Sequence, residues 1–279
     1  MGEVLIAATI MAGLAGFFGV VLAVSQRYLR VDVDPRIEQV EQQLPGTNCG
    51  ACGEPGCAGF AEKVVSGELI PARCTVSSPL QIQHLASFLG VEAGTQEKRV
   101  ARLHCAGGKS SVRQLAEYHG VDSCRAAVVV NAGWRACPWG CLGLGDCDDA
   151  CTFDAIAMTA EALPRVDVVA CTACGDCVDV CPLDLFALAP LSHHTIVQCS
   201  APLTGELARS LCAVACDACG RCALDAADGV IEMENGLPQL RQAERAEASC
   251  TWRCPTGAIQ WVEGDQFSRG PTGREIGHG

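Results

Sequence analysis

The sequence predicts an α+β protein: an N-terminal transmembrane helix, a small cysteine domain, and then a tandem of small units that mix short helices and strands. Three observations predict this arrangement: an uncharged apolar run at the N-terminus, four separate groups of cysteines, and a shortage of aromatic residues. Only 5% of the 279 residues are aromatic, whereas 21 are cysteine and 30 are glycine. Because large side chains are scarce, we expect small units built around something other than side-chain packing.

The charge and composition disfavour several classes of function. The formal net charge is −12, and an acidic chain repels phosphate backbones, so nucleic-acid binding is not expected. With 49% hydrophobic residues the chain is not disordered by composition. It contains no Walker loop, zinc-protease motif or serine nucleophile elbow, so no catalytic nucleophile is predicted.

The first element is the apolar run, and residues 1–26 are predicted to form a membrane anchor. Residues 4–24 carry no charge, and a helix needs about 20 residues to cross a bilayer. A cleaved signal peptide fits less well, because Glu3 occupies the region that should be basic and the run exceeds the usual length of about 7–15 residues. A buried helix of a soluble domain is the other alternative.

Arg27 and Arg30 follow the run directly, and no positive residue precedes it. The positive-inside rule therefore predicts a single-pass protein of the inner (cytoplasmic) membrane, with its soluble domains on the cytoplasmic side. That compartment is reducing, and an odd number of cysteines cannot pair completely, so disulfides are not expected.

The cysteine groups divide the rest of the chain into segments. We expect a linker at 27–40, a first cysteine domain at 41–95, a connecting segment at 96–135, a two-part repeat at 136–190, a related unit at 191–262 and a flexible tail at 263–279.

The third cysteine group predicts a bacterial-type [4Fe–4S] run. Cys171, Cys174, Cys177 and Cys181 are spaced by two, two and three residues, and Pro182 follows. Three closely spaced thiolates on one loop bind one cluster, and the fourth cysteine reaches the other cluster of the pair. This spacing is typical of a ferredoxin-like βαβ-type unit.

The second group is a looser copy of that run, with spacings of three, five and three residues. Exchange of the fourth cysteines predicts two ligand sets. Cluster A takes Cys137, Cys141, Cys147 and Cys181, and cluster B takes Cys171, Cys174, Cys177 and Cys151.

The last unit lacks three of the eight cysteines that two clusters would need. Ala226, Glu244 and Glu247 stand where three further cysteines would be expected. The same exchange leaves one complete set, Cys216, Cys219, Cys222 and Cys254, so we predict a degenerate ferredoxin-like unit with one cluster. A local set of Cys212, Cys216, Cys219 and Cys222 is the alternative.

The first group has a different pattern, in which Cys49, Cys52, Cys57 and Cys74 are spaced by two, four and sixteen residues. This suits one [4Fe–4S] cluster, although the spacing alone also permits zinc. Four clusters are therefore predicted in all. The remaining cysteines are expected to be buried small apolar residues: Cys105, Cys124, Cys199, Cys212 and Cys250.

The chain resembles the iron–sulfur B subunit of the Rnf-type electron transport complex. The resemblance rests on residues 44–57 (LPGTNCGACGEPGC), 105–108 (CAGG) and 137–147 (CPWGCLGLGDC), and extends to about residue 262. It implies an iron–sulfur subunit of an ion-translocating oxidoreductase, of the translocase class, that relays electrons between ferredoxin and NAD with sodium-ion or proton transport. The implied partners are soluble ferredoxin and the membrane subunits of the complex, and the first group is implied to be a [4Fe–4S] site.

Two other functions fit parts of the pattern. One is an anchored ferredoxin-like subunit of an unrelated dehydrogenase or hydrogenase. The other is an iron–sulfur redox sensor, which would need an output domain that the acidic chain does not display. The chain itself shows no substrate-converting site.

The anchor can be tested by deletion. A chain lacking residues 1–26 should become soluble without detergent, because the only long uncharged run is removed. The full chain should remain in the membrane pellet after a salt wash. Full-length protein found wholly in the soluble fraction would contradict the anchor.

Overall fold

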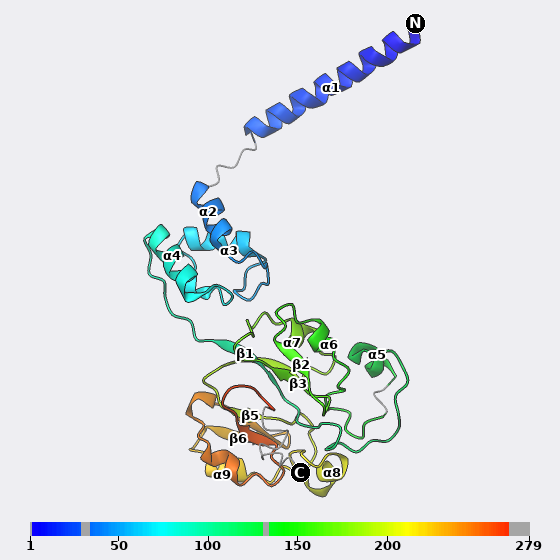
Figure 1. Ribbon diagram of the computed structural model, residues 1–279, viewed down its shortest axis with the longest axis vertical. Coiled ribbons are helices and arrows are strands. Elements are labelled where there is room, and N and C mark those ends of the chain that lie inside the picture. Colours follow the sequence, from blue (N-terminus) through cyan, green and yellow to red (C-terminus); the bar gives the residue numbers. More distant parts are fainter. Residues whose placement is uncertain (1, 29–33, 131–133, 268–279) are drawn as a thin grey trace.

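The computed structural model describes residues 2–28, 34–130 and 134–267. It is a mixed helix and strand protein, as the sequence predicts, with an N-terminal helix, a helical unit and two units with short antiparallel strand pairs (Figure 1). Arg30, most of the expected tail and part of the expected linker lie outside these residues.

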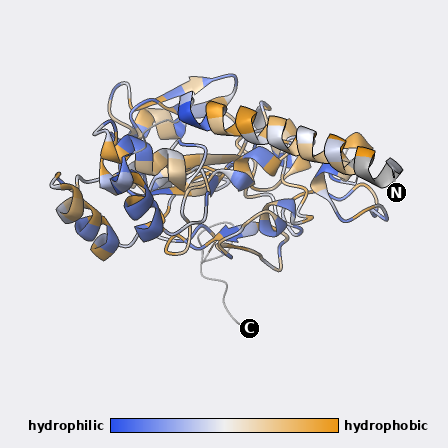
Figure 2. Ribbon diagram, turned by 90° about the horizontal axis from the view of Figure 1, so that it is seen from above, coloured by the Kyte–Doolittle hydropathy of each residue, from blue (hydrophilic) through white to orange (hydrophobic). Residues whose placement is uncertain are grey.

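Helix α1 (Gly2–Tyr28) projects away from the rest of the chain (Figure 1). Its segment Ala8–Tyr28 is long and apolar enough to cross a membrane, and none of it is buried against the protein. Large apolar side chains such as Phe17 and Leu22 are more than 60% exposed, and Figure 2 shows the hydrophobic character of the helix. An exposed helix of this kind requires lipid or partner helices around it.

Helix α2 overlaps the end of the predicted linker (27–40) and packs against the helices of the cysteine domain. Asp34 caps α2 by accepting a hydrogen bond from Arg36 N, and Ser78 forms a capping box at α4. Val40, Phe60 and Leu85 form the small core of this helical unit. The helices are α2 (Pro35–Gln43), α3 (Cys57–Val65), η1 (Pro71–Arg73) and α4 (Pro79–Leu89).

Part of the predicted connecting segment (96–135) belongs to the middle unit, because it contributes a strand to it. Strand β1 (Arg99–Leu103) pairs antiparallel with β4 (Phe186–Pro190), with Leu103 opposite Phe186. Leu163, Val166 and Leu185 lie beneath these strands in one apolar cluster. The other elements are α5 (Cys124–Val129), α6 (Asp146–Asp149), β2 (Ile156–Met158), β3 (Pro164–Val166) and α7 (Asp176–Val180), of which β2 and β3 pair with each other.

The last unit repeats this plan with two further strand pairs. Val230, Ile231 and Ile259 are buried between its strands and helices. Its elements are β5 (Thr195–Val197) with β8 (Ile259–Trp261), β6 (Ile231–Glu234) with β7 (Leu237–Leu240), and α8 (Gly205–Leu211), α9 (Arg221–Asp225), η2 (Ala243–Arg245) and α10 (Ser249–Trp252).

Residues 264–267, which we call the return segment, pack onto the middle unit although they lie in the expected flexible tail. Gln266 is buried, accepts a hydrogen bond from Leu103 N at 2.9 Å and donates one to Leu103 O at 2.7 Å. Arg102 Nη1 donates to Gly264 O at 2.8 Å. The return segment therefore covers strand β1 with hydrogen bonds that no local sequence pattern signals.

Replacing this buried amide should destabilise the middle unit. Gln266→Ala removes both side-chain bonds to Leu103, and unpaired buried backbone groups cost about 1–3 kcal/mol, which lowers the apparent melting temperature by several degrees. Gln239→Ala, at an exposed position of β7, serves as the matched control. Equal melting temperatures for the two variants, followed by circular dichroism, would contradict this role.

Candidate iron–sulfur sites

All 21 cysteines are free thiols, and sixteen of them line four cavities. Each cavity has four cysteines, no cysteine lines two cavities, and their empty volumes, including the open mouth, are alike at about 310 to 350 Å³. We call them cavity A (Cys124, Cys141, Cys147, Cys181), cavity B (Cys151, Cys171, Cys174, Cys177), cavity C (Cys216, Cys219, Cys222, Cys254) and cavity D (Cys105, Cys137, Cys199, Cys212).

Cavity B brings together the four residues expected for cluster B. The loop between Cys171 and Cys177 turns tightly, because Ala173 and Gly175 have φ values of 59° and 101°, in the left-handed region. This turn lets three thiols of one short loop face a common space. The fourth, Cys151, ends the preceding run, and its Sγ accepts a hydrogen bond from Ala155 N at 3.3 Å.

Cavity A differs from the predicted cluster A set at one position. Cys141, Cys147 and Cys181 line it, but the fourth thiol is that of Cys124, while Cys137 lines cavity D. The physical reason is the anchoring of α5, since the Asp146 carboxylate accepts hydrogen bonds from Cys124 N at 2.7 Å, Arg125 N at 3.1 Å and Ser123 Oγ at 3.0 Å. This anchoring places the start of α5 beside α6, where Cys124 takes the position expected for Cys137.

Cavity C contains the four thiols expected for the degenerate unit. Its loop repeats the conformation of cavity B, with φ values of 58° at Ala218 and 71° at Gly220. Cys212, which the alternative local set would use, lines cavity D.

The place where a second cluster of this unit would lie is filled by apolar packing. Ala226 and the buried Cys250 pack with Val230 and Ile231, and the Cys250 thiol donates to Glu247 O at 2.8 Å. Glu244 and Glu247 are not buried, so neither carboxylate points into a closed site.

The first cysteine group lies in the helical unit around the loop that precedes α3. Asn48 Oδ1 accepts a hydrogen bond from Cys57 N at 2.8 Å, and Ser77 Oγ donates to Cys74 Sγ at 3.1 Å. Burial raises the pKa of the Cys52 thiol, and the neighbouring thiols of Cys74 and Cys49 raise it as well. Cys52, Cys57 and Cys74 also pack on one apolar cluster, so the four residues of this group lie close together.

Burial makes these thiols unfavourable sites for an isolated negative charge. It raises the pKa of Cys147, Cys177, Cys212 and Cys216 to about 12, and neighbouring thiols add to the shift. Metal ligands must be thiolates, so iron binding must displace protons that the protein alone would retain at neutral pH. The positive charge of the metal stabilises the negative charge of the thiolates, which the apolar protein interior does not.

The thiols are spread around their cavities rather than gathered at a point. In the part of the chain that the structure describes, no three or more Cys, His, Asp or Glu side chains converge closely enough for a single metal ion. One zinc ion draws its thiolates to about 2.3 Å from a common centre. A [4Fe–4S] cube binds each thiolate through a different iron, so its sulfurs lie farther apart, and the geometry fits the cube better than zinc.

Comparisons with known proteins agree with this chemistry. The family model FeS, for an Fe–S cluster, matches residues 44–76. The B subunit of the proton-translocating ferredoxin:NAD(+) oxidoreductase complex of Clostridium ljungdahlii is 36% identical over 266 residues, covering 94% of both chains.

Two further relatives have related names. The B subunit of the Na(+)-translocating ferredoxin:NAD(+) oxidoreductase complex of Acetobacterium woodii is 35% identical over 94% of this chain and 80% of its own length. The B subunit of the ion-translocating oxidoreductase complex of Methanosarcina acetivorans is 35% identical over 93% of this chain and 99% of its own length.

The degenerate unit gives a direct test with two neighbouring cysteines. In the full chain produced under anaerobic conditions, Cys254→Ala should lower the iron content by about four atoms per chain, because it removes one of the four predicted ligands that line cavity C. Cys250→Ala should leave the iron content unchanged, since that thiol lies in the apolar core. Equal iron loss in both variants, or in neither, would contradict the assignment.

Proposed function

Because the chain belongs to the family of B subunits of ion-translocating ferredoxin:NAD(+) oxidoreductase complexes, we propose that it is the membrane-anchored arm through which electrons pass between soluble ferredoxin and the NAD-reacting part of such a complex. It is a subunit of an ion-translocating oxidoreductase, and its role within the complex is electron transfer. The observation that carries the proposal is the series of cavities, each lined by four cysteines, that continues from one unit to the next.

The proposed ligands form four sets. They are Cys49, Cys52, Cys57 and Cys74; Cys151, Cys171, Cys174 and Cys177; Cys141, Cys147 and Cys181 with Cys124 in place of Cys137; and Cys216, Cys219, Cys222 and Cys254. When bound, [4Fe–4S] clusters at these sets supply one-electron transfer.

Neighbouring sets are joined by direct contacts of the chain. Thr75, next to Cys74, donates a hydrogen bond from Oγ1 to Thr172 O at 2.7 Å, between Cys171 and Cys174 of cavity B. The pKa of the Cys147 thiol of cavity A is raised by burial and also by the nearby thiol of Cys177 of cavity B. The helical unit, cavity B and cavity A therefore follow one another in space, which is the arrangement an electron relay requires.

The protein contributes hydrogen bonds and the exclusion of water around the thiols. Backbone N–H groups donate to the Sγ atoms of Cys151 at 3.3 Å and Cys181 at 3.5 Å. Such bonds stabilise the thiolate form and, with burial, set the reduction potential of an iron–sulfur site. They are the means by which this chain would adjust each step of the relay.

The anchor supports a location beside the membrane subunits of the complex. The segment Ala8–Tyr28 of α1 is exposed and strongly apolar, and the basic residue Arg27 lies in the last turn of the helix. We infer that α1 crosses the membrane and that the units after it face the cytoplasm, where soluble ferredoxin is available. The transported ion is either sodium or the proton.

The proposal can be tested in a strain that lacks its own B subunit. Inverted membrane vesicles carrying the full chain should reduce NAD with reduced ferredoxin, and Cys174→Ala should reduce that rate to the level of vesicles without the chain. Cys250→Ala should retain the wild-type rate, since this thiol lines none of the four cavities. A full rate in vesicles that carry Cys174→Ala would contradict the relay.

A further inference from the structure

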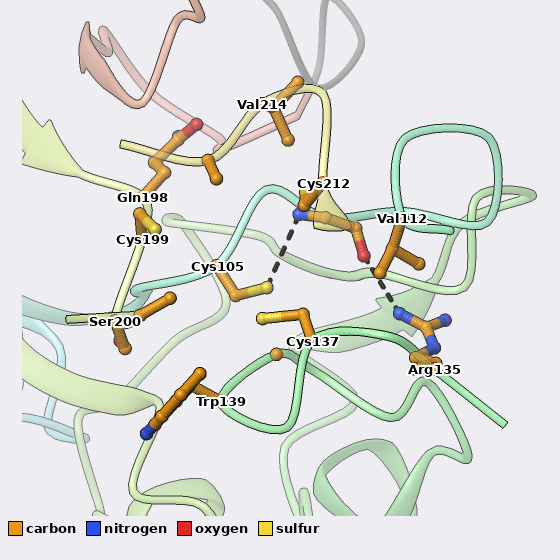
Figure 3. Close-up of a pocket in the computed structure, with 14 residues that line it drawn as sticks. Cys105, Val112, Arg135, Cys137, Trp139, Gln198, Cys199, Ser200, Cys212 and Val214 are labelled. Carbon is orange, nitrogen blue, oxygen red and sulfur yellow. Dashed lines mark hydrogen bonds between the residues drawn. The ribbon is translucent and has the colours of Figure 1, made fainter. Parts of the chain in front are cut away.

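Cavity D is a fourth space of the same kind as cavities A, B and C, although no sequence motif predicts it. Its empty volume of about 350 Å³ equals that of cavity A, and it is lined by Cys105, Cys137, Cys199 and Cys212. Figure 3 shows the thiols of Cys105 and Cys137 facing each other across this space. Cys105, Cys137 and Cys212 are buried, so little water reaches them.

Backbone N–H groups beside cavity D donate hydrogen bonds to one of its sulfur atoms, and they would stabilise a thiolate there. Cys105 Sγ accepts hydrogen bonds from Cys141 N at 3.2 Å and from Gly107 N at 3.4 Å. Two backbone N–H groups directed at one sulfur match the arrangement around iron–sulfur ligands. In cavities A and B, by comparison, Cys181 and Cys151 each accept one such bond, at 3.5 Å and 3.3 Å.

Two glycines keep the space open beside the sulfurs. A Cβ atom at Gly107 would lie 3.2 Å from Cys212 Sγ and 3.6 Å from Cys105 Sγ. A Cβ atom at Gly140 would lie 3.5 Å from Cys137 Sγ. A side chain at Gly107 would therefore crowd the sulfurs that line the cavity.

A buried positive charge lies against the cavity without a carboxylate partner. Arg135 is only 5% exposed, and its Nη1 atom donates to Cys141 O at 2.6 Å and to Gly107 O at 2.9 Å. Among the described residues it forms no ion pair, and its Nε atom has no hydrogen-bond partner. A buried charge is costly unless it is compensated, and an anionic iron–sulfur cluster with four thiolates would compensate it.

We propose that Cys105, Cys137, Cys199 and Cys212 bind a fifth [4Fe–4S] cluster, and that Cys124 completes the site in cavity A from which Cys137 is absent. This assignment gives every cavity four thiolates and uses all cysteines but Cys250, whose thiol is bonded to Glu247 O. Zinc fits less well, because in the described residues no three of these thiols converge closely enough for a single metal ion.

The fifth site lies between two of the others. Cys141 of cavity A contacts Cys105 of cavity D through the N–H···S bond of 3.2 Å. On the other side, the pKa of the Cys216 thiol of cavity C is raised by burial and also by the nearby thiol of Cys199. The fifth cluster would thus connect the middle unit with the last one, and only this relay role rests on the proposed function.

Double substitutions in the full chain show which cysteines share a cluster. Removing two ligands of one cluster loses the iron of one cluster, whereas removing ligands of two clusters loses the iron of both. Wild-type chain, made anaerobically, should contain about 20 iron and 20 sulfide, and Cys137→Ala/Cys199→Ala and Cys124→Ala/Cys141→Ala should each contain about four fewer. Cys137→Ala/Cys141→Ala should contain about eight fewer, since these thiols belong to different clusters. If Cys137 served cavity A, this last pair would lose only about four.

A single substitution and a spectrum complete the test. Cys199→Ala, at a half-buried position, should remove the same electron paramagnetic resonance signal of the reduced chain as Cys212→Ala, and leave the signal that Cys171→Ala removes. Cys250→Ala is the control with unchanged iron. Wild-type iron and spectra in both Cys199→Ala and Cys212→Ala, or the loss of one zinc in place of four irons, would overturn the proposal. These outcomes concern metal content, so they are independent of NAD reduction.

Discussion

The structure depends on the burial of thiols next to other thiols. Each unit has only a few large apolar residues, such as Phe60 and Leu85 in the helical unit or Leu163 and Phe186 in the middle unit. Cores of this size contribute little to stability, and the cysteines within them cannot ionise without a compensating charge. The same buried thiols are the atoms through which metal binding would complete the fold.

The sequence predicted the cysteine sets that lie mainly on one loop, but it did not predict contacts between segments that are far apart in the chain. The sets of cavities B and C could be read from spacing, because three ligands share one loop whose turn needs small residues such as Ala173 and Ala218. The position of Cys124 in the lining of cavity A, where Cys137 was expected, could not be predicted in this way, since it depends on hydrogen bonds between Asp146 and the start of α5. The α+β class was also predicted correctly, whereas the pairing of β1 with β4 was not, because no pattern in residues 96–135 indicates a partner so far along the chain.

In the last unit, apolar side chains occupy the region where the sequence predicts that a second cluster is missing. Where the second cluster would lie, Ala226, Cys250 and Ile231 form an apolar core, and the two glutamates that replace cysteines remain accessible to solvent. In this region side-chain packing supplies the order that metal ligation would otherwise supply. The buried Cys250 behaves accordingly as a small apolar residue whose thiol is satisfied by a backbone carbonyl.

The return segment has a consequence for biosynthesis. Its residues 264–267 are translated after every other described part of the chain, yet they supply the bonds that Gln266 makes with both backbone groups of Leu103 on β1. Strand β1 therefore leaves the ribosome long before β4 and the return segment can cover it, and domains generally fold as units during synthesis. The middle unit therefore stays incomplete until residues 264–267 have been made, after the whole of the last unit.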